Sequence, residues 1–329
     1  MTVAVAERDG TVYAIDPTDG AIDWQFDVGP TLTGGPTPAP EAFVVGAADG
    51  SVLAVARDGS TVQWTYDETA AAVGTPPTVA DGLVYVGADD GTVHAIDVAT
   101  GDRRWSTTVS GGRITGTPAM GEELLFVGAG DRSLYALEIA EGEVRWTYDE
   151  PRGPLRAGPV VAGDSVLVGS DDRRLYAVDR HDGQRRWTFD EPTGPLFARP
   201  TVDDEVAYLG AWEALFGVDL EDGTRRWVRE FSTTGIDAGP ALLDGSLFVG
   251  ALSGDLHAVD ALDGDSRWRA EVAGARIAVA PLVAGEVVVV AADDGTVVGI
   301  DREAGETSWT VSEPSGPIVG LCGDGGGGP

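Results

Sequence analysis

The stretch AIDPTDGAIDW, residues 14–24, recurs in eight versions along this chain of 329 residues. Each version has a small residue, an aspartate two positions later, a turn that ends in glycine, and a closing tryptophan. Clear copies are AIDVATGDRRW ending at Trp105, AVDRHDGQRRW at Trp187 and AVDALDGDSRW at Trp268, and weaker copies end at Trp64, Trp146, Trp227 and Trp309. The tryptophans lie 40 or 41 residues apart. A fixed period of this size indicates a repeat architecture, and the eight units leave no room for a second domain.

The third unit shows the pattern of secondary structure. Short apolar or alternating runs cover residues 75–80, 83–88 (LVYVGA), 92–97 (TVHAID) and 103–109, and turns rich in Asp and Gly separate them. Four short strands joined by such turns predict an antiparallel meander. No helical periodicity intervenes. We therefore predict an all-β fold, an eight-bladed β-propeller of four-stranded antiparallel blades.

The two ends of the chain predict how the ring closes. The sequence EPRGPL at Glu150 and EPTGPL at Glu191 returns as EPSGPI at Glu313, after the last tryptophan. A ninth inner strand is therefore expected near residues 318–323, while the first unit lacks an inner strand. We expect the C-terminal strand to complete the N-terminal blade, which leaves no free sheet edge between the termini. Residues 1–323 would form the single propeller, and residues 324–329 (DGGGGP) a flexible Gly-rich tail.

The recurrent tryptophan is expected to hold the blades together. A tryptophan lying flat between its own blade and the next buries roughly 150–250 Å². At about 25 cal/mol per Å² this contributes on the order of 4–6 kcal/mol before opposing terms. The aspartate of the motif would accept backbone N–H bonds and so stabilise the turn.

The composition is strongly acidic, with 22 basic against 54 acidic residues and a net charge of −32. All basic residues are arginine, and the chain contains no lysine and no asparagine. Such a charge disfavours nucleic acids and anionic membrane surfaces as partners. The composition resembles that of proteins from halophilic archaea, in which dense surface carboxylates keep the chain soluble. Molar salt shortens the Debye length to about 3 Å, so that the repulsion is screened.

The single cysteine and the lack of an evident targeting signal give a weak indication of where the protein resides. Cys322 is the single cysteine, which excludes an internal disulfide. No apolar stretch is long enough to insert into a membrane, and no charged-then-apolar leader opens the chain. As written, the chain is expected to be cytoplasmic and monomeric, or exported or surface-anchored if a leader has been removed.

The motif and its period resemble the tryptophan-docking motif of PQQ-repeat β-propellers, a family that includes quinoprotein alcohol dehydrogenases and non-enzymatic BamB-like propellers. The resemblance covers all eight units. Departures are Ala56 and Glu138 in place of the aspartate, and Gly217 and Gly299 in place of the alanine. The Gly-His and Trp-Asp signatures of WD-repeat proteins, which share the period, are missing.

The resemblance leaves two functions open, because one fold hosts both. Quinoprotein dehydrogenases carry insertions that hold a catalytic aspartate, calcium ligands that include asparagine, and often two adjacent cysteines. The nearly uniform spacing here leaves no such insertions. We therefore expect no catalytic residues, no metal and no cofactor; PQQ with Ca²⁺ belongs to the alternative, a minimal quinoprotein oxidoreductase.

The histidines and the acidic turns do not predict metal sites. His94 and His257 occupy the strand position held by Tyr13, Tyr135 and Tyr176 in other units, so we expect them to be packing residues. The recurring Asp-Asp turns lack the spaced carboxylates of a calcium loop.

Residues that break the repeat are the candidate binding residues. The loop into the inner strand and the loop between the second and third strands are expected to share one face, around the central channel. On the loop into the inner strand small residues predominate, with six exceptions: Arg113, Arg156, Phe197, Arg199, Asp237 and Arg276. On the other loop, the sixth unit has Trp212-Glu213-Ala214 in place of Asp-Asp-Gly. Aromatic rings and arginines in an acidic protein suggest a site for an anionic small ligand or a carboxylate-bearing protein partner. In the alternative, the arginines pair with local aspartates and Trp212 fills space. Our hypothesis is a non-catalytic, BamB-like scaffold that binds a protein or a ligand through this face.

Overall fold

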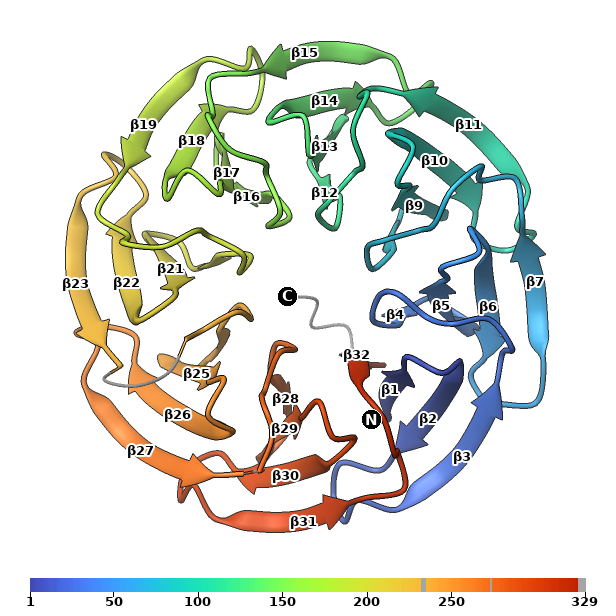
Figure 1. Cartoon of the computed structure of the whole chain (residues 1–329), viewed down its shortest axis with the longest axis vertical. Helices are drawn as coiled ribbons and strands as arrows, with labels where there is room; N and C mark the ends of the chain where they lie inside the picture. Colours follow the sequence, from blue (N-terminus) through green and yellow to red (C-terminus); the bar gives the residue numbers. More distant parts are fainter. Residues whose placement is uncertain (232–234, 273, 325–329) are drawn as a thin grey trace.

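The computed structural model describes residues 1–231, 235–272 and 274–324. These residues form 32 strands in eight four-stranded antiparallel sheets, with no helix among them. The sheets are arranged as blades around a central axis (Figure 1). The predicted eight-bladed propeller is confirmed. In the part of the chain that the structure describes, no helix is long and apolar enough to cross a membrane.

The strands are given blade by blade, from the inner to the outer strand. Blade 1 contains β32 (Ile318–Gly323), β1 (Val3–Glu7), β2 (Thr11–Ile15) and β3 (Ile22–Asp27); blade 2 β4 (Thr37–Pro38), β5 (Ala42–Gly46), β6 (Val52–Ala56) and β7 (Val62–Tyr66); blade 3 β8 (Thr78–Ala80), β9 (Leu83–Gly87), β10 (Thr92–Asp97) and β11 (Arg103–Thr108); blade 4 β12 (Ala119–Met120), β13 (Leu124–Gly128), β14 (Leu134–Glu138) and β15 (Val144–Tyr148). Blade 5 contains β16 (Val160–Ala162), β17 (Ser165–Gly169), β18 (Leu175–Asp179) and β19 (Arg185–Phe189); blade 6 β20 (Thr201–Val202), β21 (Val206–Ala211), β22 (Ala214–Asp219) and β23 (Arg225–Glu230); blade 7 β24 (Ala241–Leu243), β25 (Ser246–Gly250), β26 (Asp255–Asp260) and β27 (Ser266–Glu271); blade 8 β28 (Leu282–Ala284), β29 (Val287–Ala291), β30 (Val297–Asp301) and β31 (Thr307–Val311).

Burial explains the sequence pattern of the strands. The second and third strands of a blade are covered on both faces by neighbouring blades, and β5 and β6 are buried along their whole length. Such strands are apolar throughout rather than alternating. The outer strands alternate, as in β7, where Trp64 and Tyr66 are buried and their neighbours are more exposed. The core is therefore a ring of apolar layers between blades.

Each recurrent tryptophan bonds to the following blade. In blade 2, the Trp64 indole N–H donates to the Val98 carbonyl oxygen at 2.9 Å, and its ring lies against Gly101. A Cβ at Gly101 would come within 2.9 Å of this ring, and the residue has a φ of 77°, so glycine is required there on both grounds. The same bond recurs around the ring, from Trp24 to Arg57, Trp105 to Ile139, Trp146 to Arg180, Trp187 to Leu220, Trp227 to Ala261, Trp268 to Arg302 and Trp309 to Pro17.

The motif aspartate stabilises the turn that receives this tryptophan. The Asp97 carboxylate accepts the backbone N–H groups of Ala99 at 3.0 Å and Thr100 at 3.2 Å, and pairs with Arg104 at 2.8 Å. These interactions, the Ala99 bond first, hold the pKa of Asp97 below its usual range. The turn thus presents its glycine to the tryptophan of the preceding blade.

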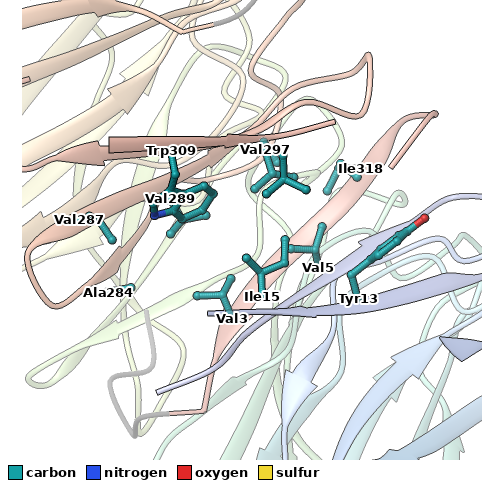
Figure 2. Packing of buried hydrophobic residues seen from close by; sticks show 12 residues of the cluster. Val3, Val5, Tyr13, Ile15, Ala284, Val287, Val289, Val297, Trp309 and Ile318 are labelled. Carbon is teal, nitrogen blue, oxygen red and sulfur yellow. The ribbon is translucent and has the colours of Figure 1, made fainter. Parts of the chain in front are cut away.

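The chain ends close the ring as predicted. Strand β32 pairs antiparallel with β1, with Val5 opposite Leu321. Figure 2 shows the apolar joint between blades 8 and 1, in which Trp309 lies among side chains of both. Asp324, the first residue of the predicted tail, exchanges two hydrogen bonds with Thr2, at 2.7 and 3.0 Å. Residues 325–329 of that tail lie outside the described residues.

Candidate functional site

One face of the ring carries both the interblade loops, which join an outer strand to the next inner strand, and the hairpin loops between second and third strands. We call it the channel face. The two kinds of loop lie side by side: the Ile236 N–H in the loop into blade 7 donates to the Trp212 carbonyl oxygen at 2.9 Å. The corresponding contact at blade 5 runs from the Leu196 N–H, in the loop into blade 6, to the Ser170 carbonyl oxygen at 3.3 Å. All seven predicted residues lie on these loops, but they are spread from blade 4 to blade 8 rather than gathered in one place.

Three of the predicted arginines are paired with aspartates of the hairpin loops. Arg113 lies 3.7 Å from Asp89, and Arg156 lies 2.7 Å from Asp171. Arg276 bonds to Asp293 at 2.7 Å. All three guanidinium groups are largely exposed, so each pair contributes only about 0–1 kcal/mol. These three arginines therefore pair with local aspartates, as in the alternative to a binding site.

Arg199 differs from these three. It stands immediately before Pro200 at the start of blade 6, where the other blades have a small or uncharged residue. Its Nε is buried and has no hydrogen-bond partner, and no carboxylate pairs with it among the described residues. Burial lowers the pKa of the guanidinium. The Nε–H is removed from water without a hydrogen bond in return, and this costs stability.

Two aromatic side chains on the same blade are exposed. Phe197 is 37% exposed and Trp212 is 44% exposed. Trp212 has a φ of 41°, an unusual conformation for a bulky residue, and its Cβ packs over Gly194 in the loop that leads to Phe197. Trp212 therefore does not fill a void in the core.

Asp237, on the next interblade loop, is half-buried. Its Oδ1 is buried and has no partner among the described residues. Burial raises the pKa of its carboxyl group, while the charge of Arg276 opposes the rise. The backbone of this loop lies against Arg199, because a Cβ on Gly239 would come within 2.5 Å of the Arg199 carbonyl oxygen. Phe197, Arg199, Trp212 and Asp237 thus belong to adjacent loops of blades 6 and 7, and we call them the channel-mouth residues.

His94, His257 and Cys322 are packed between blades, whereas the third histidine, His181, is exposed in a turn. The His94 Nδ1 lies 2.8 Å from the Tyr66 hydroxyl, and His257 packs edge-on against Phe231 with ring centroids 4.9 Å apart. Burial lowers the pKa of His257 to about 4 and raises that of the Cys322 thiol to about 12. Within the described residues, no group of three or more His, Cys, Asp or Glu side chains converges on a point where a metal could bind.

Sequence reasoning missed two adjoining grooves on blade 5. One has a volume of about 570 Å³ and the other about 380 Å³, and both include Arg174 and Asp190. None of the seven predicted residues lines either groove. A signal was present in the sequence: the turn that begins at Asp171 has Arg173 where the similar turns have Gly91 and Gly295.

Comparisons with known proteins agree with the fold. The family model described as outer membrane protein assembly factor BamB, a PQQ-repeat model, matches residues 1–117, 110–237 and 215–326. No curated protein sequence matches the chain.

Three solved structures show the same architecture. BamB from Moraxella catarrhalis is 21% identical over 73% of this chain and 73% of its own, with a TM-score of 0.64. The computationally designed Ika8 protein is 19% identical over 89% of this chain and 90% of its own, with a TM-score of 0.81. Quinohemoprotein alcohol dehydrogenase from Comamonas testosteroni is 15% identical over 95% of this chain and 70% of its own, with a TM-score of 0.77. At these identities the likeness concerns the fold alone. The family model, in contrast, spans nearly the whole sequence, and the chain therefore belongs to the BamB family of PQQ-repeat β-propellers.

Proposed function

We propose that this propeller is a non-catalytic scaffold that binds a protein partner or an anionic ligand at its channel mouth. Arg199 would bind a carboxylate or another anionic group, and the exposed rings of Phe197 and Trp212 would cover the apolar part of the same ligand. Assembly, the role named in the family description, requires binding without chemistry, which this arrangement supports.

The observation that carries the proposal is the unpaired state of Arg199. The chain has 54 acidic residues, yet none of those described pairs with this guanidinium. A charge-assisted hydrogen bond from a guanidinium to a carboxylate is among the strongest that a protein forms. A ligand carboxylate would therefore recover free energy that the unbound protein lacks.

The test uses Trp212 as a reporter and phenylacetate, which combines a carboxylate with an aromatic ring, as the probe. Because Trp212 is the most exposed tryptophan, binding at the channel mouth should quench the intrinsic fluorescence saturably. Arg199→Met and Trp212→Phe should each abolish this quenching, whereas Arg276→Met, a variant of an ion-paired arginine on the same face, should retain it. Saturable quenching that survives Arg199→Met would contradict the proposed role of Arg199.

The oxidoreductase alternative requires PQQ and calcium. Calcium takes six to eight oxygen ligands, and among the described residues no cluster of three or more carboxylates supports such a site. The proposal therefore predicts no dye reduction when the protein is mixed with PQQ, calcium and short-chain alcohols. Catalytic dye reduction at one equivalent of PQQ would show that the protein is an oxidoreductase and would overturn the scaffold proposal.

A further inference from the structure

The two grooves on blade 5 adjoin each other, because Arg174 and Asp190 line both. The larger groove is lined by Glu150, Arg152, Arg174, Tyr176, Arg185, Thr188 and Asp190. The smaller groove is lined by Asp172, Arg173, Arg174, Asp190, Glu191, Pro192 and Thr193. The smaller groove lies among interblade and hairpin loops of the channel face, and the larger groove extends from there along β18 and β19, which carry Tyr176, Arg185 and Thr188. Together they form a continuous feature, which we call the blade-5 groove.

The walls of the blade-5 groove are held in place before any ligand binds. The Asp172 carboxylate accepts the backbone N–H of Arg152 at 2.8 Å and the Tyr176 hydroxyl at 2.7 Å. The Ser170 hydroxyl donates to the Gly153 carbonyl oxygen at 3.0 Å. Gly153 lies so close to this turn that a Cβ would come within 2.6 Å of the Asp172 nitrogen. A preformed site loses little conformational entropy on binding.

Two guanidinium groups in the blade-5 groove are unpaired. Arg185 pairs with Glu150, and Arg174 lies 3.8 Å from Asp190. Arg152 and Arg173 are exposed and form no ion pair or side-chain hydrogen bond with any described residue. Most arginines of this acidic chain do pair with a carboxylate. The Thr188 hydroxyl, which also lines the groove, is buried without a partner among the described residues.

We infer that the blade-5 groove binds an acidic peptide segment of a partner protein, with Arg152 and Arg173 each taking one carboxylate. Arg152 lines the larger groove and Arg173 the smaller one, so a ligand that contacts both must extend along the blade-5 groove, as an extended chain can. Glu150 and Asp190, in the same walls, can accept backbone N–H groups of a peptide, which a compact anion such as phosphate does not offer. The inference goes beyond the channel-mouth proposal and uses none of its residues, so either can fail without the other.

The test measures fluorescence anisotropy of a labelled hexaglutamate peptide with the full chain, in the lowest salt at which far-ultraviolet circular dichroism shows the folded sheet. We expect saturable binding of hexaglutamate and none of hexaglutamine. The double variant Arg152→Gln/Arg173→Gln should weaken binding at least about tenfold, since two charge-assisted contacts are lost. Both side chains are exposed, so the variant should fold, and circular dichroism checks this.

Arg132→Gln is the matched control. Arg132 occupies the same turn position in blade 4, has a positive φ of 79° as Arg173 has 71°, and carries the same charge, but it lines neither groove. It should leave binding unchanged. If Arg132→Gln weakened peptide binding as much as the double variant, the loss would reflect net charge alone, and the inference would be overturned. Equal binding of hexaglutamine would also overturn it, as would displacement of the peptide by equimolar inorganic phosphate.

Discussion

Trp105→Ala tests the interblade joint in a place remote from the channel mouth. The Trp105 side chain is only 9% exposed, its indole N–H donates to the Ile139 carbonyl oxygen at 2.8 Å, and its ring covers Gly142. Truncation of a buried tryptophan to alanine costs about 3–5 kcal/mol through lost apolar burial and the remaining cavity. The Ile139 carbonyl also loses its partner, which places the expected loss in the upper part of this range.

The assay is urea unfolding at constant salt, followed by far-ultraviolet circular dichroism. Trp212→Ala serves as the comparison, because Trp212 is 44% exposed and should change the free energy of unfolding by less than about 1 kcal/mol. A loss below about 1 kcal/mol in Trp105→Ala, or equal losses in the two variants, would refute the view that the indole rings hold the blades together.

Three further predictions concern the same ring. Gly142→Ala should lower the free energy of unfolding in urea by about 1–3 kcal/mol more than Gly163→Ala. Both glycines have positive φ, but only at Gly142 would an added Cβ meet a ring, 2.5 Å from Trp105. Equal losses would show that contact with the tryptophan ring is not what requires glycine at this position. Dialysis into low salt should abolish the far-ultraviolet signal of the β-sheet, because repulsion among 54 carboxylates is then unscreened, and an unchanged spectrum would count against the halophilic interpretation. Between pH 6.5 and about 4 the unfolded chain protonates His257 while the folded protein does not, so the free energy of unfolding should fall as the pH is lowered through this window. His257→Tyr, which introduces the residue found in sibling blades, should remove on the order of 2 kcal/mol of this pH dependence. Parallel pH curves for the two proteins would contradict the lowered pKa of His257.

The fold could be predicted because its determinants are local and repeated. The regular spacing of the tryptophans revealed the blades, and the repeated EPxGP sequence at Glu313 revealed the closing strand. The role of the turn glycine was only partly visible. The conformation of this glycine follows from the turn. Its contact with the tryptophan of the preceding blade, however, joins residues far apart in sequence. Gly101 and Trp64 are 37 positions apart, and their contact can be recognised only once the blades are arranged in a ring.

The candidate site was less predictable, because pairing between loops depends on side-chain reach. Arg113, Arg156 and Arg199 are all arginines that break the repeat on interblade loops. Only the structure distinguishes the first two, which meet aspartates, from Arg199, whose Nε meets none among the described residues. The blade-5 groove was missed for the same reason, since Arg152 and Arg173 lie in turns that look like ordinary solvated loops.

The free energy of unfolding of Arg199→Met tests most directly whether the channel mouth is built for a ligand rather than for stability. If the guanidinium is retained for binding, its replacement by an apolar side chain of similar length should stabilise the unliganded protein by on the order of 1 kcal/mol. A loss of stability of similar size would show that Arg199 supports the fold, and would contradict the account.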